Sequence, residues 1–210
     1  MGHIVASFTR ASELLVAHPE QFDFVVSFHA FVGSPWGPSR PAAGFAQFTG
    51  PKISTQFDDT EKDHAGLYKT VSYAQMQKLL SFYKSVGNQS NGLFHCAAGI
   101  SRSSAACLIF LCNWMTPQEA LKQVSLAMLR DGHPKDLAPV AGSCVVKELT
   151  QHAHPNRRMV YMADHILRLN GVLVTEFDRS FDRRTPPDFG TWVFKKRGPA
   201  TKTTQEKGLK

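Results

Sequence analysis

Short apolar stretches alternate with amphipathic stretches along most of the chain. The apolar stretches at residues 3–8, 22–28, 52–57 and 92–94 predict strands. The amphipathic stretches predict helices. Residues 71–86, for example, carry apolar side chains at the i, i+3, i+4, i+7 spacing, namely Met76, Leu79, Leu80 and Tyr83. Strands that alternate with helices favour an α/β fold of three layers, with a mostly parallel central sheet of four to five strands and helices on both faces.

The second half of the chain carries clear helix signals and two less regular segments. Thr116-Pro117-Gln118-Glu119 has the form of a capping box and predicts a helix over residues 117–130. A last helix is expected to begin at Pro155 or Asn156 and to end at Gly171. Residues 33–50 are rich in Gly, Pro and Ser and predict a loop. Residues 134–154 are irregular and indicate an insertion. We therefore expect a domain over residues 1–171 and a partly disordered tail over residues 172–210.

The positive charge is concentrated in that tail. The chain has 24 Lys and Arg and 17 Asp and Glu, a net charge of +7. Nine of the basic residues but only three of the acidic ones lie between Arg179 and Lys210. The remainder of the chain is therefore close to neutral. A basic tail of this kind is most often solvated, and it can also attract nucleic acid or an acidic surface.

Length and cysteine content narrow the class of protein. The 210 residues, 42% of them hydrophobic, are enough for one α/β domain with a buried core. No apolar run is long enough for a membrane helix, and the first residues lack the pattern of a signal peptide. The four cysteines show no paired spacing, so no disulfide framework is expected. Free thiols favour a reducing compartment, and the cytoplasm is the expected location.

Residues 95–103, HCAAGISRS, carry the chemistry of the chain. The apolar residues before and after this segment predict a strand, a tight loop and a helix, with Cys96 at the end of the strand. Such a loop directs several backbone N–H groups and the positive end of the helix dipole at one point. Arg102 would add a planar donor suited to phosphate. In that field Cys96 is expected to be a thiolate, a nucleophile that faces a bound oxyanion. The alternative is a small buried hydrophobic residue at the end of a strand.

This segment resembles the signature loop of the cysteine-dependent protein tyrosine and dual-specificity phosphatases: His-Cys, five residues, Arg, then Ser or Thr. It is most similar to the short, single-domain bacterial tyrosine phosphatase-like branch. The resemblance implies that Cys96 forms a phosphocysteine intermediate, with no metal and no cofactor. It also implies that Arg102 holds the phosphoryl group together with the backbone N–H groups of the loop, which belong to Ala97, Ala98, Gly99, Ile100, Ser101 and Arg102.

Two neighbours of the cysteine receive roles from the same resemblance. Ser103 is expected to hydrogen-bond the sulfur and to ease its departure in the second step; the alternative is an ordinary hydroxyl at the start of a helix. His95 is expected to support the loop by hydrogen bonds and to lower the pKa of the cysteine rather than to transfer protons itself.

The leaving oxygen requires a proton, and its donor must come from another segment. Phe57-Asp58-Asp59-Thr60, at the end of a predicted strand, is the best candidate. The Phe-x-Asp pattern of the family matches Asp59 to the acid, with Asp58 as the alternative and Asp63 as a third. It is also open whether this acidic turn holds a catalyst at all.

The sequence thus predicts a phosphatase acting on phosphotyrosine, and also on phosphoserine, phosphothreonine or a small phosphomonoester. Related enzymes that act on inositol lipids typically carry lysines in this loop, whereas Ala97, Ala98 and Ile100 are uncharged. The resemblance therefore disfavours highly phosphorylated lipid headgroups. One alternative is a phosphatase-fold module that binds phosphoproteins without turnover. Another is a sulfurtransferase or an arsenate reductase, although the five-residue spacing and Ser103 favour a phosphatase over the former.

Overall fold

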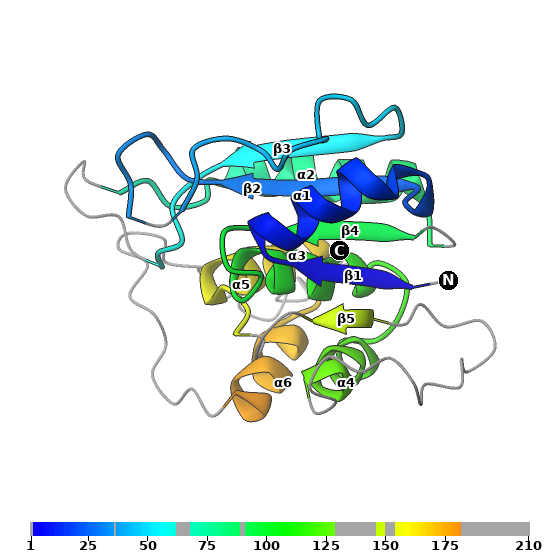
Figure 1. The fold of residues 1–210 in the computed structure, drawn as a ribbon. Helices are drawn as coiled ribbons and strands as arrows, with labels where there is room; N and C mark the ends of the chain where they lie inside the picture. The colour runs from blue at the N-terminus through cyan, green and yellow to red at the C-terminus, as the bar shows by residue number, and fades with distance from the viewer. Residues whose placement is uncertain are drawn as a thin grey trace, which may run out of the picture.

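In the described part of the chain, five parallel strands form the central sheet (Figure 1). The computed structural model describes residues 2–35, 37–61, 68–88, 91–128, 146–149 and 154–181, without the side chains of 125–128 and 146–149. The strands are β1 (His3–Ala6), β2 (Phe24–His29), β3 (Lys52–Gln56), β4 (Gly92–His95) and β5 (Val146–Leu149). Their order across the sheet is β3-β2-β4-β1-β5, and each pair of neighbouring strands is parallel. The carboxyl ends of all five strands therefore lie at one edge.

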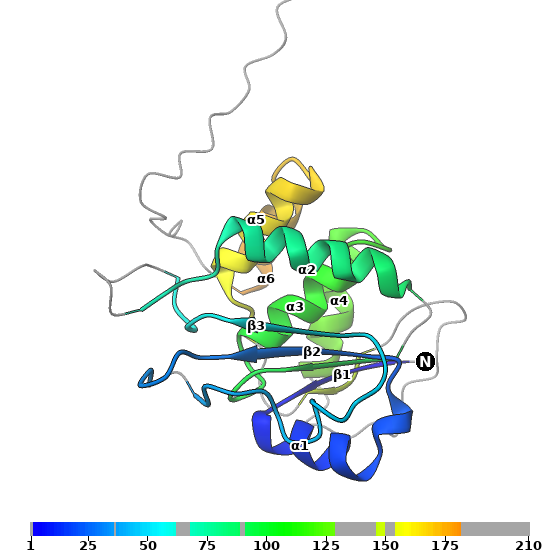
Figure 2. The ribbon, with the colours of Figure 1, turned by 90° about the horizontal axis from the view of Figure 1, so that it is seen from above.

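Helices cover both faces of this sheet. Viewed from above, α1 (Phe8–Ala17) lies on one side of the strands, and the other helices lie on the opposite side (Figure 2). These are α2 (Tyr73–Val86), α3 (Arg102–Leu111), α4 (Pro117–Met128), α5 (Arg157–Leu167) and α6 (Val172–Ser180). A short 3₁₀ turn, Pro19–Gln21, follows α1. The predicted three-layer α/β fold with a parallel sheet is confirmed.

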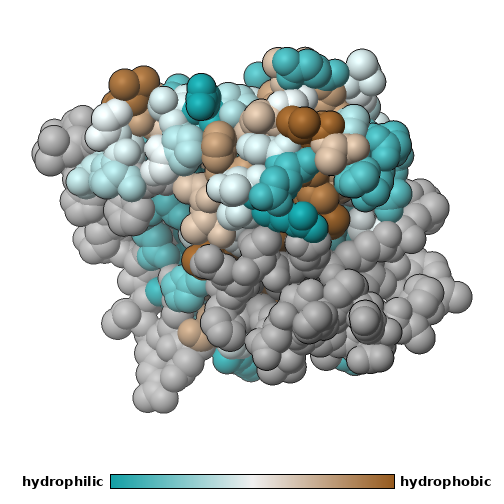
Figure 3. All heavy atoms as spheres, in the orientation of Figure 1, coloured by the Kyte–Doolittle hydropathy of each residue, from teal (hydrophilic) through white to brown (hydrophobic). Residues whose placement is uncertain are grey.

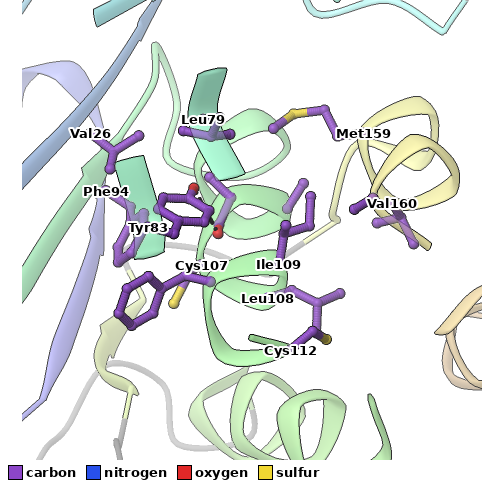
Figure 4. Packing of buried hydrophobic residues seen from close by; sticks show 14 of the residues in the cluster. Val26, Leu79, Tyr83, Phe94, Cys107, Leu108, Ile109, Cys112, Met159 and Val160 are labelled. Atoms are coloured by element: carbon purple, nitrogen blue, oxygen red, sulfur yellow. Dashed lines mark hydrogen bonds between the residues drawn. The ribbon is translucent and has the colours of Figure 1, made fainter. Parts of the chain in front are cut away.

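The main core lies between the sheet and α3, and all ten residues of α3 are buried. Its apolar side chains pack against those of β2, β4, α2 and α5 (Figure 4). Phe24, Phe94 and Phe110 contact one another at ring-centroid separations of 5.2 to 5.7 Å. The strand β4 begins with Gly92, where a Cβ would collide with the Phe24 ring. A second, smaller core lies under α1. This packing fixes β4 and α3, the two elements that flank residues 96–101.

Several local signals in the sequence specify these elements correctly. The capping box before α4 is present: Thr116 N–H donates to the Glu119 carboxylate (2.9 Å), and Glu119 N–H donates to the Thr116 hydroxyl (3.3 Å). The helix α2 has a similar box between Ser72 and Gln75. The four apolar residues that predicted it, Met76, Leu79, Leu80 and Tyr83, are all buried. The long loop at residues 33–50 contains neither helix nor strand at its described positions.

The second half of the chain differs from the prediction in two places. The segment expected to be an irregular insertion contains β5, which pairs with β1 at the edge of the sheet. The helix expected to end at Gly171 ends at Leu167, where Arg168 adopts a left-handed conformation (φ 58°). Gly171 instead precedes α6, which buries Leu173 and Phe177 at the position where the tail was expected to begin. The remaining tail, residues 182–210, lies outside the described residues, as does most of the predicted insertion.

The described surface is mixed in character. On the face seen in Figure 1, hydrophobic and hydrophilic residues are interspersed (Figure 3). Among the residues that the structure describes, the exposed large hydrophobic ones are Val16, Val32, Trp114 and Val172. Within the described part of the chain, no helix combines the length and apolar character needed to cross a membrane.

Candidate active site

The site lies at the sheet edge where the parallel strands end. The central strand β4 ends at His95, and Cys96 follows it directly. The strand β3 ends at Gln56, and Asp58 and Asp59 follow within three residues. Since β2 pairs in parallel with both β3 and β4, the two ends point the same way. In α/β sheets this edge is the usual place for ligands. Residues far apart in the sequence therefore meet here.

The loop from Cys96 to Arg102 turns at a glycine and is bonded to the segments around it. Gly99 has φ 80°, a left-handed conformation that favours glycine. The carbonyls of Ala97, Ile100 and Ser101 accept hydrogen bonds from surrounding backbone N–H groups, those of Phe8 (3.0 Å), His154 (3.0 Å) and Asn156 (3.1 Å). These bonds attach the loop to the start of α1 and to the residues just before α5.

Cys96 is buried at the end of β4, with 1% of its surface exposed. Its Sγ lies 3.2 Å from the hydroxyl oxygen of Ser103, which belongs to the first turn of α3. If the sulfur is a thiolate, the hydroxyl is the donor in this pair. The proposed nucleophile and its expected hydroxyl partner are therefore in contact.

Arg102 is the first residue of α3 and is also 1% exposed. Its Nη1 donates to the Phe57 carbonyl at 2.8 Å, and its guanidinium lies over the Phe57 ring, 6.0 Å from the centroid. Its Nε lies 3.8 Å from Asp59 Oδ2. The arginine of the loop thus joins α3 to the segment that carries the two candidate acids.

Asp59 is the aspartate that reaches the loop. Its Oδ1 accepts a hydrogen bond from the Ser101 hydroxyl (2.6 Å) and another from the Asn156 side-chain amide (3.0 Å). Its side chain is 20% exposed, so the carboxyl group is accessible from the site. The structure therefore brings Asp59 together with Ser101 and Arg102, although Ser101 lies 42 residues further along the chain.

Asp58 points elsewhere and holds the local backbone. Its Oδ2 accepts from Lys69 N–H (2.9 Å) and its Oδ1 from Phe31 N–H (3.4 Å), and only 1% of the residue is exposed. Its own N–H donates to the Lys69 carbonyl (2.8 Å). Asp58 thus joins its own segment to the backbone at Phe31 and at Lys69. Asp63, the third candidate, lies outside the described residues.

His95 lies beneath the loop in a setting that keeps its ring neutral at pH 7. Burial lowers its pKa from 6.5 to about 4, and His29 and Arg102 nearby add to the decrease. The Cys96 backbone lies close enough to offset part of it. Neither ring nitrogen, however, makes a hydrogen bond of normal geometry to any described residue. The support of the loop expected of His95 and its role in lowering the cysteine pKa both stay predictions.

Asn156 is a site residue that the sequence identified only as a helix start. Its side-chain oxygen caps α5 by accepting Met159 N–H (3.1 Å), and its amide nitrogen donates to Asp59. Its backbone N–H donates to the Ser101 carbonyl. One residue thus contacts the signature loop and the candidate acid together. An asparagine directly before a helix is a common N-cap, so the sequence alone gives no sign of the second role.

Gly37, in the loop between β2 and β3, packs against the signature loop. It has φ 122°, and a Cβ at this position would collide with the Ala97 side chain and lie 3.9 Å from Arg102 Nη2. This close approach requires glycine and helps to bury Arg102.

The other described cysteines lie away from this edge, in the packed interior. Cys107 and Cys112 lie on α3 among apolar side chains (Figure 4). Cys107 is fully buried, and burial raises the pKa of Cys112 to about 12. A thiol in such surroundings is a poor nucleophile. These positions do not favour the resolving thiols that an arsenate reductase needs. Cys144 lies outside the described residues.

Comparison with known proteins gives similarity at the level of overall structure. No family model matches the sequence, and no curated protein matches it either. Among solved structures, Tk-PTP in its active form is 15% identical, with a TM-score of 0.44 over 80% of this chain and 93% of that chain. The Yvh1 phosphatase domain from Chaetomium thermophilum is 17% identical, with a TM-score of 0.43 over 81% of this chain and 92% of that chain.

Proposed function

We propose that this protein is a metal-free phosphatase that hydrolyses phosphotyrosine, and also phosphoserine or phosphothreonine, through a phosphocysteine intermediate. One observation carries the proposal. Asp59 contacts Ser101 and Arg102, while Cys96 contacts Ser103 in the first turn of α3, the helix that Arg102 begins. These contacts support the proposal because they bring Cys96, Arg102 and Asp59 to one sheet edge, and phosphomonoester hydrolysis requires a nucleophile, an anion-binding group and a proton donor.

The first step transfers the phosphoryl group to sulfur. The Cys96 thiolate attacks phosphorus, a sulfur–phosphorus bond forms and the ester oxygen leaves with the bonding electrons. Asp59 gives that oxygen its proton. Since Oδ1 already accepts from Ser101 and Asn156, Oδ2, which lies 3.8 Å from Arg102 Nε, is the oxygen left for the proton transfer. Arg102 and the loop N–H groups hold the nonbridging oxygens throughout.

The second step regenerates the enzyme. Water attacks the phosphocysteine, and Asp59, now a carboxylate, accepts a proton from that water. The sulfur–phosphorus bond breaks, inorganic phosphate leaves and the thiolate returns. The Ser103 hydroxyl, 3.2 Å from the sulfur, donates to the departing thiolate and stabilises it.

Hydrolysis of an aryl phosphate by the wild type and by Cys96→Ser tests the proposal. We expect turnover by the wild type and none by the variant. A phosphopeptide panel (phosphotyrosine against phosphoserine and phosphothreonine) then gives the residue preference. A wild-type protein that binds the phosphopeptides but hydrolyses neither class of substrate would contradict the proposal and favour a binding module.

A further inference from the structure

Arg158 is a buried cation that the proposed reaction does not use. It lies in the first turn of α5, two residues after Asn156, and is 5% exposed. Burying a long charged side chain is costly unless its donors are bonded. Where those donors point therefore indicates what the residue holds in place.

The Arg158 guanidinium contacts residues 57–71, the acid-bearing segment, which carries Asp59. Its two contacts lie on either side of residues 62–67, which are outside the described residues. Its Nη1 donates to the carbonyl of Glu61 and its Nε to the carbonyl of Val71, each at 3.3 Å. Glu61 follows Asp59 by two residues, and Val71 precedes the N-cap of α2. A single side chain thus joins residues ten positions apart. The bonds between Asp58 and Lys69 join the same two stretches of the acid-bearing segment.

The same turn of α5 is also attached to the signature loop. The backbone of Asn156 bonds to the Ser101 carbonyl, and its side chain bonds to Asp59. A helix turn is rigid compared with the loops on either side. Arg158 and Asn156 together therefore fix the acid-bearing segment to the start of α5, which also contacts the loop at residues 96–102.

We propose that Arg158 is a positioning residue that holds residues 57–61 so that the Asp59 carboxyl stays at its distance from the loop. This inference rests on the proposed function only in its catalytic consequence. The planar guanidinium suits the task because its donors are fixed relative to one another and can bond two carbonyls at once. An ammonium group offers no such fixed pair.

Arg157 provides a matched control in the same chain. It is the adjacent residue on α5, is 4% exposed and is also bonded through its guanidinium. Its Nη2, however, lies 3.1 Å from the Asp178 carboxylate of α6 and 2.9 Å from the Tyr161 hydroxyl. Removal of either guanidinium thus deletes a buried cation from α5. These Arg157 bonds run to α5 and α6, whereas those of Arg158 run to the carbonyls of Glu61 and Val71.

The first measurement needs no catalysis. Amide hydrogen exchange of the wild type, Arg158→Met and Arg157→Met is compared at Asp58, Thr60 and Lys69, whose N–H groups are bonded within this segment. We expect exchange at these amides to become about tenfold faster in Arg158→Met, with little change in Arg157→Met. Arg158→Lys, which keeps the charge and can reach one carbonyl, is expected to lie between them and serves if the methionine variant does not fold. Equal exchange at these amides in folded variants of both arginines would overturn the inference.

The second measurement reads the catalytic consequence. A misplaced acid should matter most when the leaving group is poor. For Arg158→Met we expect kcat on phenyl phosphate to fall by about tenfold, and kcat on p-nitrophenyl phosphate by about threefold or less, with KM unchanged. For Arg157→Met both substrates should change by the same factor. If Arg158→Met, like Arg157→Met, lowers kcat by the same factor on both substrates, the positioning role is contradicted. An inert wild type would instead contradict the proposed function, and the exchange measurement would still decide on Arg158.

Discussion

The substitution Asp59→Asn removes the proposed proton donor and keeps the shape of the side chain. The Asp59 Oδ1 accepts from Ser101 and Asn156 at 2.6 and 3.0 Å. The carbonyl oxygen of an asparagine can take both bonds, so folding should change little. The amide cannot exchange a proton with the substrate. General acid catalysis is worth about 10²- to 10⁴-fold, and we expect Asp59→Asn to lose that factor on phosphates with poor leaving groups.

The same substitution at position 58 should affect a different property. Both Asp58 oxygens accept backbone N–H groups, from Lys69 at 2.9 Å and Phe31 at 3.4 Å. In either orientation, an asparagine turns its NH₂ toward one of these donors and leaves that N–H unpaired in a buried place. We expect Asp58→Asn to lower the free energy of unfolding by about 1–3 kcal/mol. Asp59 is intact in this variant, so the dependence of kcat on the leaving group should match that of the wild type.

Two assays separate these outcomes. The kcat of each protein is measured across a series of aryl phosphates of decreasing leaving-group acidity, and urea unfolding is measured in parallel. Asp59→Asn should steepen the dependence on the leaving group at nearly unchanged stability. Asp58→Asn should do the reverse. If Asp58→Asn steepens the dependence and Asp59→Asn does not, the assignment of the acid is wrong.

Three further predictions concern other parts of the site. The pKa of His95 is about 4 in the folded protein against 6.5 in the unfolded chain, so its contribution to stability is full above pH 6.5 and is lost as the pH falls toward 4. At about 1.4 kcal/mol per pKa unit this contribution amounts to about 3 kcal/mol. Between pH 6.5 and 4 the free energy of unfolding, measured with urea, should therefore fall by that much less in His95→Gln than in the wild type. Identical pH profiles of the two proteins would contradict this prediction. Ser103→Ala should slow breakdown of the intermediate by about 10- to 100-fold, seen as a burst of leaving group, and a variant without a burst would remove the assigned role of this hydroxyl. Vanadate should inhibit and a metal chelator should not; activity lost in the chelator would contradict a metal-free reaction.

Local signals predicted the elements that hold the site. The strand, loop and helix around Cys96 follow from an apolar run, a glycine-containing loop and a second apolar run. The capping box at Thr116 identifies the start of α4 because its two bonds are local in sequence. The strand β5 was missed since its four residues, Val-Lys-Glu-Leu, include two charges and do not alternate. It is a strand because β1 offers it an edge to pair with.

Long-range contacts could not be predicted in the same way. Asp58 and Asp59 are adjacent and chemically identical, and only the family pattern separated them in the sequence. The structure separates them physically, because one bonds the backbone at Lys69 and the other reaches Ser101. The Asn156–Asp59 bond joins residues 97 apart. No local pattern encodes such a contact, since it depends on how α5 packs against the edge of the sheet.

The most direct test of the central claim is to find the phosphoryl group on the protein during turnover. The wild type is mixed with an aryl phosphate, quenched with acid within one turnover and digested, and the modified peptide is located by mass spectrometry. We predict a phosphoryl group on Cys96, absent from Cys96→Ser. Turnover with no modification of Cys96, or undiminished hydrolysis by Cys96→Ser, would contradict the phosphocysteine mechanism.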